Sequence, residues 1–132
     1  MPTMPDDFYT LQDDFINVFK FTRSTETAVD EWAIALERTI EETPESERFY
    51  ILLDVSGDDV TFSQSARAHS KRIFSEYKER KGYIAMVFEW RTSPYFARVF
   101  FATIGKLGFK LNYFTDDKAA KAWLRDMHAN ES

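Results

Sequence analysis

The chain begins with two short runs of apolar residues that the alternation of side chains predicts to be strands. They cover Phe8–Leu11 and Phe15–Phe21, and Asp13-Asp14 lies between them, which is typical of a β-hairpin. The second run is apolar on both faces, so we expect it in the interior of a sheet. One face would carry Phe15, Asn17, Phe19 and Phe21, and the other Ile16, Val18 and Lys20.

A helix and a buried strand are predicted next. Apolar residues recur at helical spacing over Thr27–Thr43, with Thr27 placed as the N-cap and Pro44 ending the helix. The run Phe49–Val55 is continuously apolar and is closed by Ser56-Gly57, a pattern typical of a parallel strand that is covered on both faces. The apolar stripe of the helix consists of Val29, Trp32, Ala33, Leu36 and Ile40.

The same alternation of helix and strand continues through the second half. A helix is predicted over Phe62–Arg80 with Gly82 closing it, and a buried strand over Tyr83–Trp90. Ser93-Pro94 is a strong helix start, and we expect that helix to run to about Leu107. The last two elements are a strand over Phe109–Phe114 and a helix capped by Asp116 or Asp117.

Strands that alternate with helices of ten or more residues indicate an α/β fold with a mainly parallel sheet. We therefore predict a mixed sheet of about five strands with an N-terminal hairpin and four helices. With 132 residues and no linker, the chain is expected to form a single domain over 1–132, in which residues 1–7 are a flexible lead.

Composition supports a folded domain and removes several kinds of chemistry. Hydrophobic residues make up 44% of the chain and aromatic residues 17%, which is enough apolar material for a sizeable core. The absence of cysteine excludes disulfides, thiolate metal sites and cysteine nucleophiles. The acidic stretch Met1–Asp14 does not resemble a secretory signal, and no apolar run is long enough to span a membrane. We expect a cytoplasmic protein.

The net charge of −5 is unevenly divided along the chain. Residues 1–47 hold 12 acidic against 3 basic residues, and residues 48–132 hold 10 acidic against 14 basic residues. Such a division could attract a second copy or an oppositely charged partner, although ordinary solvated faces also produce it. An acidic chain without a concentrated basic motif does not favour nucleic-acid binding.

Three stretches stand out: the strand end Leu52–Gly57, the strand Tyr83–Val87, and Asn112–Leu124 with its aromatic strand end, acidic cap and Ala-x-x-Trp-Leu helix. Together they resemble the STAS domains of anti-sigma-factor antagonists, and more closely their SpoIIAA-like branch in bacteria. The resemblance covers nearly the whole chain. It implies a non-enzymatic regulatory domain that binds a protein.

In the phospho-switched members of that family, the resemblance implies a regulatory serine just before the helix that follows the central strand. Ser63 is the nearest hydroxyl here and is the candidate phosphosite. Phe62 and Ser65 stand where those members carry an acid and a glycine. Helix capping is the alternative role for Ser63.

Few residues suggest catalysis or metal binding. Ser65 and His69 lie four residues apart on one helical face, but no third residue is placed to orient the histidine. His128 was expected in a frayed C-terminus, so the sequence predicts no histidine metal site. The acid pairs Asp58-Asp59 and Asp116-Asp117 occupy a loop and a helix cap, where acids are common. We expect no metal, no cofactor and no catalytic residue.

The predicted helix Ser93–Leu107 carries more apolar surface than one covered face requires. Its surplus would be buried in a homodimer interface, against a partner, around an apolar ligand or under a neighbouring helix. The candidate residues for this apolar interface or pocket are Tyr95, Phe96, Phe100 and Phe101.

Ligands of open parallel sheets usually bind beyond the carboxyl ends of the strands, which places a second candidate site there. Arg67 and Lys71, together with Lys78, would extend this site along the second helix as a basic docking face. The residues of the loop site are Ser56, Gly57, Thr61, Ser63, Trp90, Arg91 and Ser93.

Two functions follow from these sites. The first is a binding or regulatory module that docks a protein partner through the second helix and the loop before it. The alternative is a small carrier that holds an apolar or amphipathic ligand beside the aromatic third helix. An enzyme is the least favoured class, because no catalytic motif is present.

Overall fold

The elements of the computed structural model alternate between strand and helix. The structure describes residues 7–57, 60, 64–88 and 109–131. In chain order the elements are β1 (Phe8–Asp13), β2 (Ile16–Phe21), α1 (Glu26–Glu42), β3 (Phe49–Asp54), α2 (Gln64–Glu76), β4 (Gly82–Val87), β5 (Lys110–Phe114) and α4 (Asp117–Glu131).

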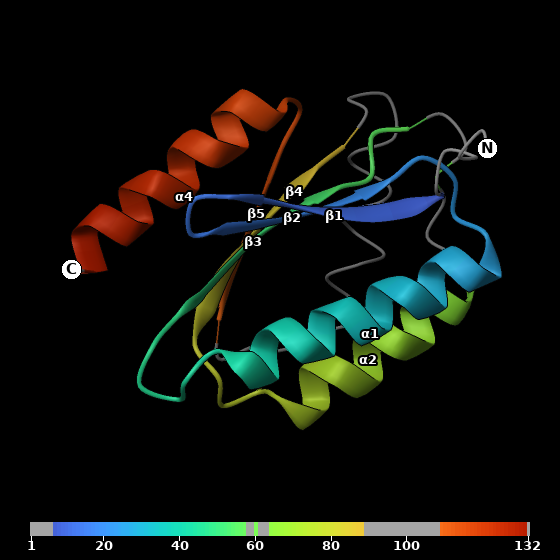
Figure 1. Ribbon diagram of the computed structural model, residues 1–132, viewed down its shortest axis with the longest axis horizontal. Helices are drawn as coiled ribbons and strands as arrows, with labels where there is room; N and C mark the ends of the chain where they lie inside the picture. The colour runs from blue at the N-terminus through green and yellow to red at the C-terminus, as the bar shows by residue number, and fades with distance from the viewer. Residues whose placement is uncertain (1–6, 58–59, 61–63, 89–108, 132) are drawn as a thin grey trace, which may run out of the picture.

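The predicted α/β class is confirmed, because one mixed sheet lies between two layers of helices. The sheet has five strands; α1 and α2 lie on one face and α4 on the other (Figure 1). The described residues contain three helices rather than the four that the sequence predicts. The predicted helix Ser93–Leu107 lies outside the described residues.

The strands follow one another across the sheet in the order β1-β2-β3-β4-β5. β1 pairs antiparallel with β2, and every later pair is parallel. The predicted hairpin and the interior position of β2 are thus confirmed. Asp14 allows the tight turn between β1 and β2 by adopting a left-handed φ of 57°, which Asn and Asp tolerate better than other side chains.

Two apolar cores, one on each face of the sheet, explain why the central strands are apolar throughout. All six residues of β3 and of β4 are buried. Phe19 and Leu36 belong to the core under α1 and α2, whereas Val18, Leu52 and Leu124 belong to the core under α4. Each such side chain contributes about 1.5–3 kcal/mol by leaving water, so covering both faces is a large part of the stability of the fold.

The N-cap of α1 is Thr25 and not Thr27 as predicted. The Thr25 side chain accepts a hydrogen bond from the Ala28 backbone N–H at 3.2 Å, and its own backbone is extended. Thr27 lies inside the first turn and is exposed. At the other end, the Thr43 N–H bonds to the Ile40 carbonyl at 3.3 Å just before Pro44, so the predicted helix end is confirmed.

Phe15 does not share a face with Phe19 and Phe21, contrary to the prediction. It precedes β2, and its ring packs against the core under α4. The left-handed Asp14 directly before it breaks the alternation that a continuous strand would have kept. Pattern counting therefore assigned one residue too many to this strand.

The second helix is shorter than predicted, and Gly82 begins β4 instead of closing the helix. α2 ends at Glu76, and three turn residues, Tyr77–Glu79, separate it from the stretch that leads into β4. Gly82 pairs with Phe49 of β3, and the ring of Phe49 covers the position that a side chain at residue 82 would occupy. None of the helices in the described part of the chain is long and apolar enough to cross a membrane.

Candidate functional site

The structure describes five of the residues that the sequence assigns to the loop site and docking face. Ser56 and Gly57 lie at the carboxyl end of β3, Arg67 and Lys71 lie on α2, and Lys78 lies in the turn after α2. The predicted apolar residues Tyr95, Phe96, Phe100 and Phe101 lie outside the described residues. So do the loop-site residues Thr61, Ser63, Trp90, Arg91 and Ser93.

Asp54, the last residue of β3, fixes the start of the loop that leads to α2. Its carboxylate accepts one hydrogen bond from the Ser56 N–H at 2.9 Å and a second from the Ser56 hydroxyl at 2.6 Å. The Lys20 ammonium lies 3.8 Å from the other carboxylate oxygen. The Asp54 side chain is only 11% exposed, so this buried charge is compensated by three donors. The Ser56 hydroxyl thus holds the loop in place.

Gly57 follows Ser56 at a position that leaves little room for a side chain. A Cβ on Gly57 would lie 3.1 Å from a methyl carbon of Val60 and 3.4 Å from the backbone oxygens of Phe21 and Thr22. The loop therefore packs closely onto the end of β2. The chain between β3 and α2 starts from a rigid base.

The outer surface of α2 carries a line of basic side chains without ion-pair partners in the described structure. We call Arg67, Lys71, Ser75 and Lys78 the basic row: the first three recur once per turn on one side of α2, and Lys78 lies in the turn that follows the helix. All four are exposed. No carboxylate of the described residues lies within ion-pair distance of Arg67, Lys71 or Lys78.

The neighbouring side of α2 is, in contrast, bound to α1. Arg72 pairs with Glu37, and His69 lies 3.0 Å from a carboxylate oxygen of Asp30. The Tyr77 hydroxyl, just beyond α2, donates a short hydrogen bond to Glu41 of α1. This bond, with smaller contributions from burial and nearby carboxylates, raises the pKa of Tyr77 to about 12.

His69 is held in a role that does not suit a catalytic base for Ser65. Its Nδ1 lies 3.3 Å from an Arg72 guanidinium nitrogen, which can only donate, so Nδ1 accepts. Its Nε2 then carries the proton and donates to Asp30 at 3.0 Å. Both ring nitrogens are occupied, and no hydrogen bond joins the described Ser65 and His69 side chains. The hydrogen bond between His69 and Asp30 therefore stabilises the contact between α1 and α2.

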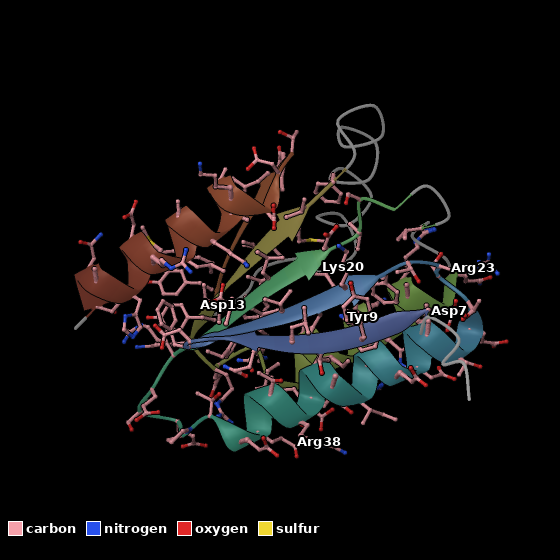
Figure 2. All side chains as sticks on the ribbon, turned by 45° about the horizontal axis from the view of Figure 1, so that its top comes forward. Asp7, Tyr9, Asp13, Lys20, Arg23 and Arg38 are labelled. Carbon is pink, nitrogen blue, oxygen red and sulfur yellow. The ribbon has the colours of Figure 1, made fainter. Side chains whose placement is uncertain are left out.

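α1 carries a matching but mainly acidic line on its own outer surface. We call Glu31, Ile34, Arg38 and Glu42 the acidic row, since they share one side of the helix and are exposed. Ile34 is 55% exposed, unusual for a large aliphatic side chain. A shallow hollow of about 390 Å³ lies over this row and is also bordered by Glu37 and Glu41. Figure 2 shows Arg38 on the margin of α1 that faces away from the sheet.

A larger cleft lies at the amino ends of the parallel strands, opposite the edge that the sequence favoured. It has a volume of about 520 Å³ and is bordered by α1, β3 and the last turns of α4. Arg48 and Glu131 pair across it at 2.9 Å. The Tyr83 hydroxyl donates to the same Glu131 carboxylate at 2.8 Å.

The tyrosines around this cleft are held as neutral phenols. Burial, followed by the charge of Glu131, raises the pKa of Tyr50, and burial with the hydrogen bond to Glu131 raises the pKa of Tyr83. Raised phenol pKa values make these groups hydrogen-bond donors and not bases at neutral pH. The cleft thus offers polar contacts without an evident proton acceptor among its tyrosines.

His128 borders the cleft, a position that sequence reasoning missed. It belongs to α4, which continues to Glu131 and is not frayed at this residue. Its ring stacks on Phe15 with 3.9 Å between ring centroids and an interplanar angle of 14°, and it meets the edge of Tyr50. The spacing of apolar residues in α4, which extends to Met127, was the available signal that the helix does not end early.

Two acidic residues of the described chain, Asp116 and Asp13, act as a helix cap and as an ion-pair partner. Asp116 caps α4 by accepting a hydrogen bond from the Ala119 N–H at 2.7 Å, as predicted. Asp13, at the end of β1, pairs with Lys121 at 3.0 Å and with Arg125 at 3.4 Å (Figure 2). The hydrogen bond and charge of Lys121 lower the pKa of Asp13. No group of three or more metal-ligating side chains occurs among the residues described.

Comparison with known proteins adds no relative to this description. No protein-family model matches the chain, and neither the curated proteins nor the solved structures give a match. The resemblance to STAS domains therefore stays a prediction from the sequence.

Proposed function

We propose that this chain is a cytoplasmic, non-enzymatic regulatory module of the STAS, SpoIIAA-like type. It docks a protein partner through the basic row of α2 and the loop that carries Ser56 and Gly57. The partner presents an acidic surface to Arg67 and Lys71. Charge attraction of this kind accelerates encounter and fixes the orientation of two proteins.

The unpaired basic row is the observation that supports this proposal most directly. On the same helix, His69 and Arg72 each have an acidic partner, while Arg67, Lys71 and Lys78 have none in the described structure. The row spans about 12 Å along α2, since Arg67 and Ser75 are eight residues apart on the helix, and Lys78 continues it in the turn beyond. Three cations along such a line match an acidic helix or strand on another protein.

The surroundings of the row also favour docking over chemistry. Ser56 and Gly57, which begin the loop, are held by the Asp54 carboxylate and by close packing on the end of β2. Nearby, both nitrogens of His69 are occupied by Asp30 and Arg72. These features support a surface that binds without transforming its partner.

The other predicted roles are not decided by the described residues. The carrier alternative and a dimer through the third helix both depend on residues outside the description, such as Phe96 and Phe100. Ser63 as a phosphosite is in the same position. They stay predictions, and the proposal above does not depend on them.

The experiment replaces both leading cations, as Arg67→Glu with Lys71→Glu, and measures capture of the partner. The immobilised wild-type chain first captures proteins from the source cells, and the captured protein is then purified and titrated by calorimetry. We expect the dissociation constant for that protein to rise at least roughly tenfold in the double variant, with an unchanged melting temperature.

The matched control is Lys110→Glu with Lys118→Glu, which changes the net charge equally. Both lysines are exposed, on β5 and α4, and neither has an ion pair in the described structure. The control should bind the partner as the wild type does. Equal weakening in both variants would show that only total charge matters, and unchanged binding in the α2 variant would overturn the docking proposal.

A further inference from the structure

α1 and α2 lie side by side and run in the same direction, so their residues can be matched level by level. Contacts between the two helices join residues 39, 35 and 36 positions apart in sequence. All three contacts advance together along both helices. A residue of α1 is therefore level with the residue of α2 that lies about 35–39 positions later.

With this offset, the acidic row of α1 and the basic row of α2 correspond member by member. At both ends of the rows, an acidic residue of one row is level with a basic residue of the other. The only cation of the acidic row, Arg38, is level with the only neutral residue of the basic row. The matched pairs are Glu31 with Arg67, Ile34 with Lys71, Arg38 with Ser75, and Glu42 with Lys78.

Within one chain these rows do not meet: no ion pair joins them in the described structure, and Arg38 and Glu42 of the acidic row also border a hollow beside β1. A two-fold axis parallel to the helices would instead place α1 of one copy over α2 of another and preserve the level of every residue. Each matched pair would then form twice. The acidic surface that the proposed docking face requires is thus present on the chain itself.

The hollow on α1 fits the side chain that this arrangement would bring to it. Ile34 supplies an apolar wall, Glu37, Glu41 and Glu42 supply three carboxylates, and Arg38 supplies a cation around a volume of about 390 Å³. A lysine packs its aliphatic stem on apolar surface and keeps its ammonium among polar groups. Lys71 is level with Ile34 and Lys78 with Glu42, so lysines of a second copy would enter at both ends of the hollow.

We propose that the outer surfaces of α1 and α2 form a self-complementary interface with a second copy of this chain. This inference rests on the proposed function, because it names one occupant of the same docking face. Self-association and partner binding then exclude each other. The free partner would release the chain from its dimer, and a high concentration of the chain would reduce partner binding.

The first measurement is the molar mass in sedimentation velocity over a concentration series. At about 20 mM NaCl, the wild type should approach twice the 15.5 kDa of one chain as its concentration rises. At about 500 mM NaCl the dissociation constant of the dimer should rise at least roughly tenfold, since exposed ion pairs are screened. A wild type that stays monomeric at low salt and high concentration overturns the inference.

The decisive measurement uses two variants that reverse the charge of one row each. The first carries Arg67→Glu and Lys78→Glu, and the second carries Glu31→Lys and Glu42→Lys. None of these residues has an ion-pair partner in the described structure, so both variants should keep the wild-type melting temperature. Each variant alone should be monomeric, because its two rows now bear the same sign.

An equimolar mixture of the two variants should restore the dimer mass, because each supplies the row that the other lacks. The variant Lys110→Glu with Lys118→Glu should dimerise like the wild type. Failure of the mixture to dimerise overturns the proposed pairing of rows, even if the wild type dimerises by another surface.

The proposed function is read from a separate signal, the binding of the captured partner by monomeric chain. A monomeric wild type that loses its partner on reversal of Arg67 and Lys71 would disprove self-association alone. The chain could instead dimerise through these rows while its captured partner still binds the variant with reversed Arg67 and Lys71. That result would disprove the docking proposal alone.

Discussion

The close approach of Phe49 to Gly82 makes Gly82→Ala a sharp test of how the two parallel strands pack. A Cβ at residue 82 would lie 2.5 Å from two carbons of the Phe49 ring and 2.6 Å from a third. Ordinary carbon contacts are about 3.5–4.0 Å, so the ring would have to move by about 1 Å. Phe49 is 2% exposed and meets the edge of Phe109, with 5.5 Å between ring centroids, so a shift of its ring disturbs that contact.

We expect Gly82→Ala to lower the free energy of unfolding by about 2 kcal/mol. Overpacking of a core costs about 1–3 kcal/mol, and the closeness of these contacts places this site near the upper end. Alanine recovers about 0.5–1 kcal/mol, because it loses less backbone entropy in a strand than glycine does. The assay is equilibrium urea denaturation followed by tryptophan fluorescence, with the denaturant slope unchanged.

A second background separates this clash from any general effect of alanine. Phe49→Leu removes the flat ring above Gly82, so adding Gly82→Ala to that variant should cost clearly less than it does in the wild type. The difference is the coupling energy of the pair. A cost below about 0.5 kcal/mol in the wild type, or an equal cost in both backgrounds, would refute the reasoning.

Two further predictions concern the contact of α1 with Tyr77 and the N-cap of α1. Tyr77→Phe removes the hydrogen bond to Glu41, and folding raises the pKa of Tyr77 from 10.0 to about 12. The free energy of unfolding of the wild type, measured by urea titration, should therefore exceed that of the variant fully below pH 10, and the difference should vanish by about pH 12. A difference that does not depend on pH would contradict this. Thr25→Ala should lower the free energy of unfolding by about 1 kcal/mol, because it removes the N-cap of α1. Thr27→Ala is the control and should lower it little. A larger loss for Thr27→Ala than for Thr25→Ala would mean that Thr27 is the cap.

The strands could be predicted from the sequence because the fold covers both faces of the sheet. A strand buried on both faces is apolar along most of its length, as β3 is up to Asp54 and β4 is throughout. β2 shows the same property with its alternating Phe19 and Val18 in separate cores. The order of the elements then favoured a parallel sheet.

The details that failed depend on contacts between distant residues. Gly82 appeared to close a helix, but it is required by the ring of Phe49, which lies in another strand. Phe15 was counted on the wrong face, because the backbone turn at Asp14 cannot be read from the spacing of apolar residues. Local patterns constrain such residues only weakly.

In the candidate site too, the local helical pattern could be predicted and the contacts between distant residues could not. Helical spacing alone predicted Arg67 and Lys71 on one exposed side of α2. That these two stay unpaired while Arg72 finds Glu37 depends on how α1 and α2 lie together, which the sequence does not encode locally. His128 was missed for the same reason, because its neighbours Phe15 and Tyr50 lie in the turn before β2 and in β3, far away in the chain.

The strictly sequential order of the five strands has a consequence for synthesis on the ribosome. Each strand pairs with the one made just before it, so the sheet can assemble as the chain emerges, without waiting for a later segment to insert between two earlier ones. The face that holds Tyr50 and Tyr83 is different, because α4 alone among the described helices covers it and is made last. A nascent chain therefore exposes an apolar face until α4 leaves the exit tunnel, and this is the stage at which a chaperone would bind it.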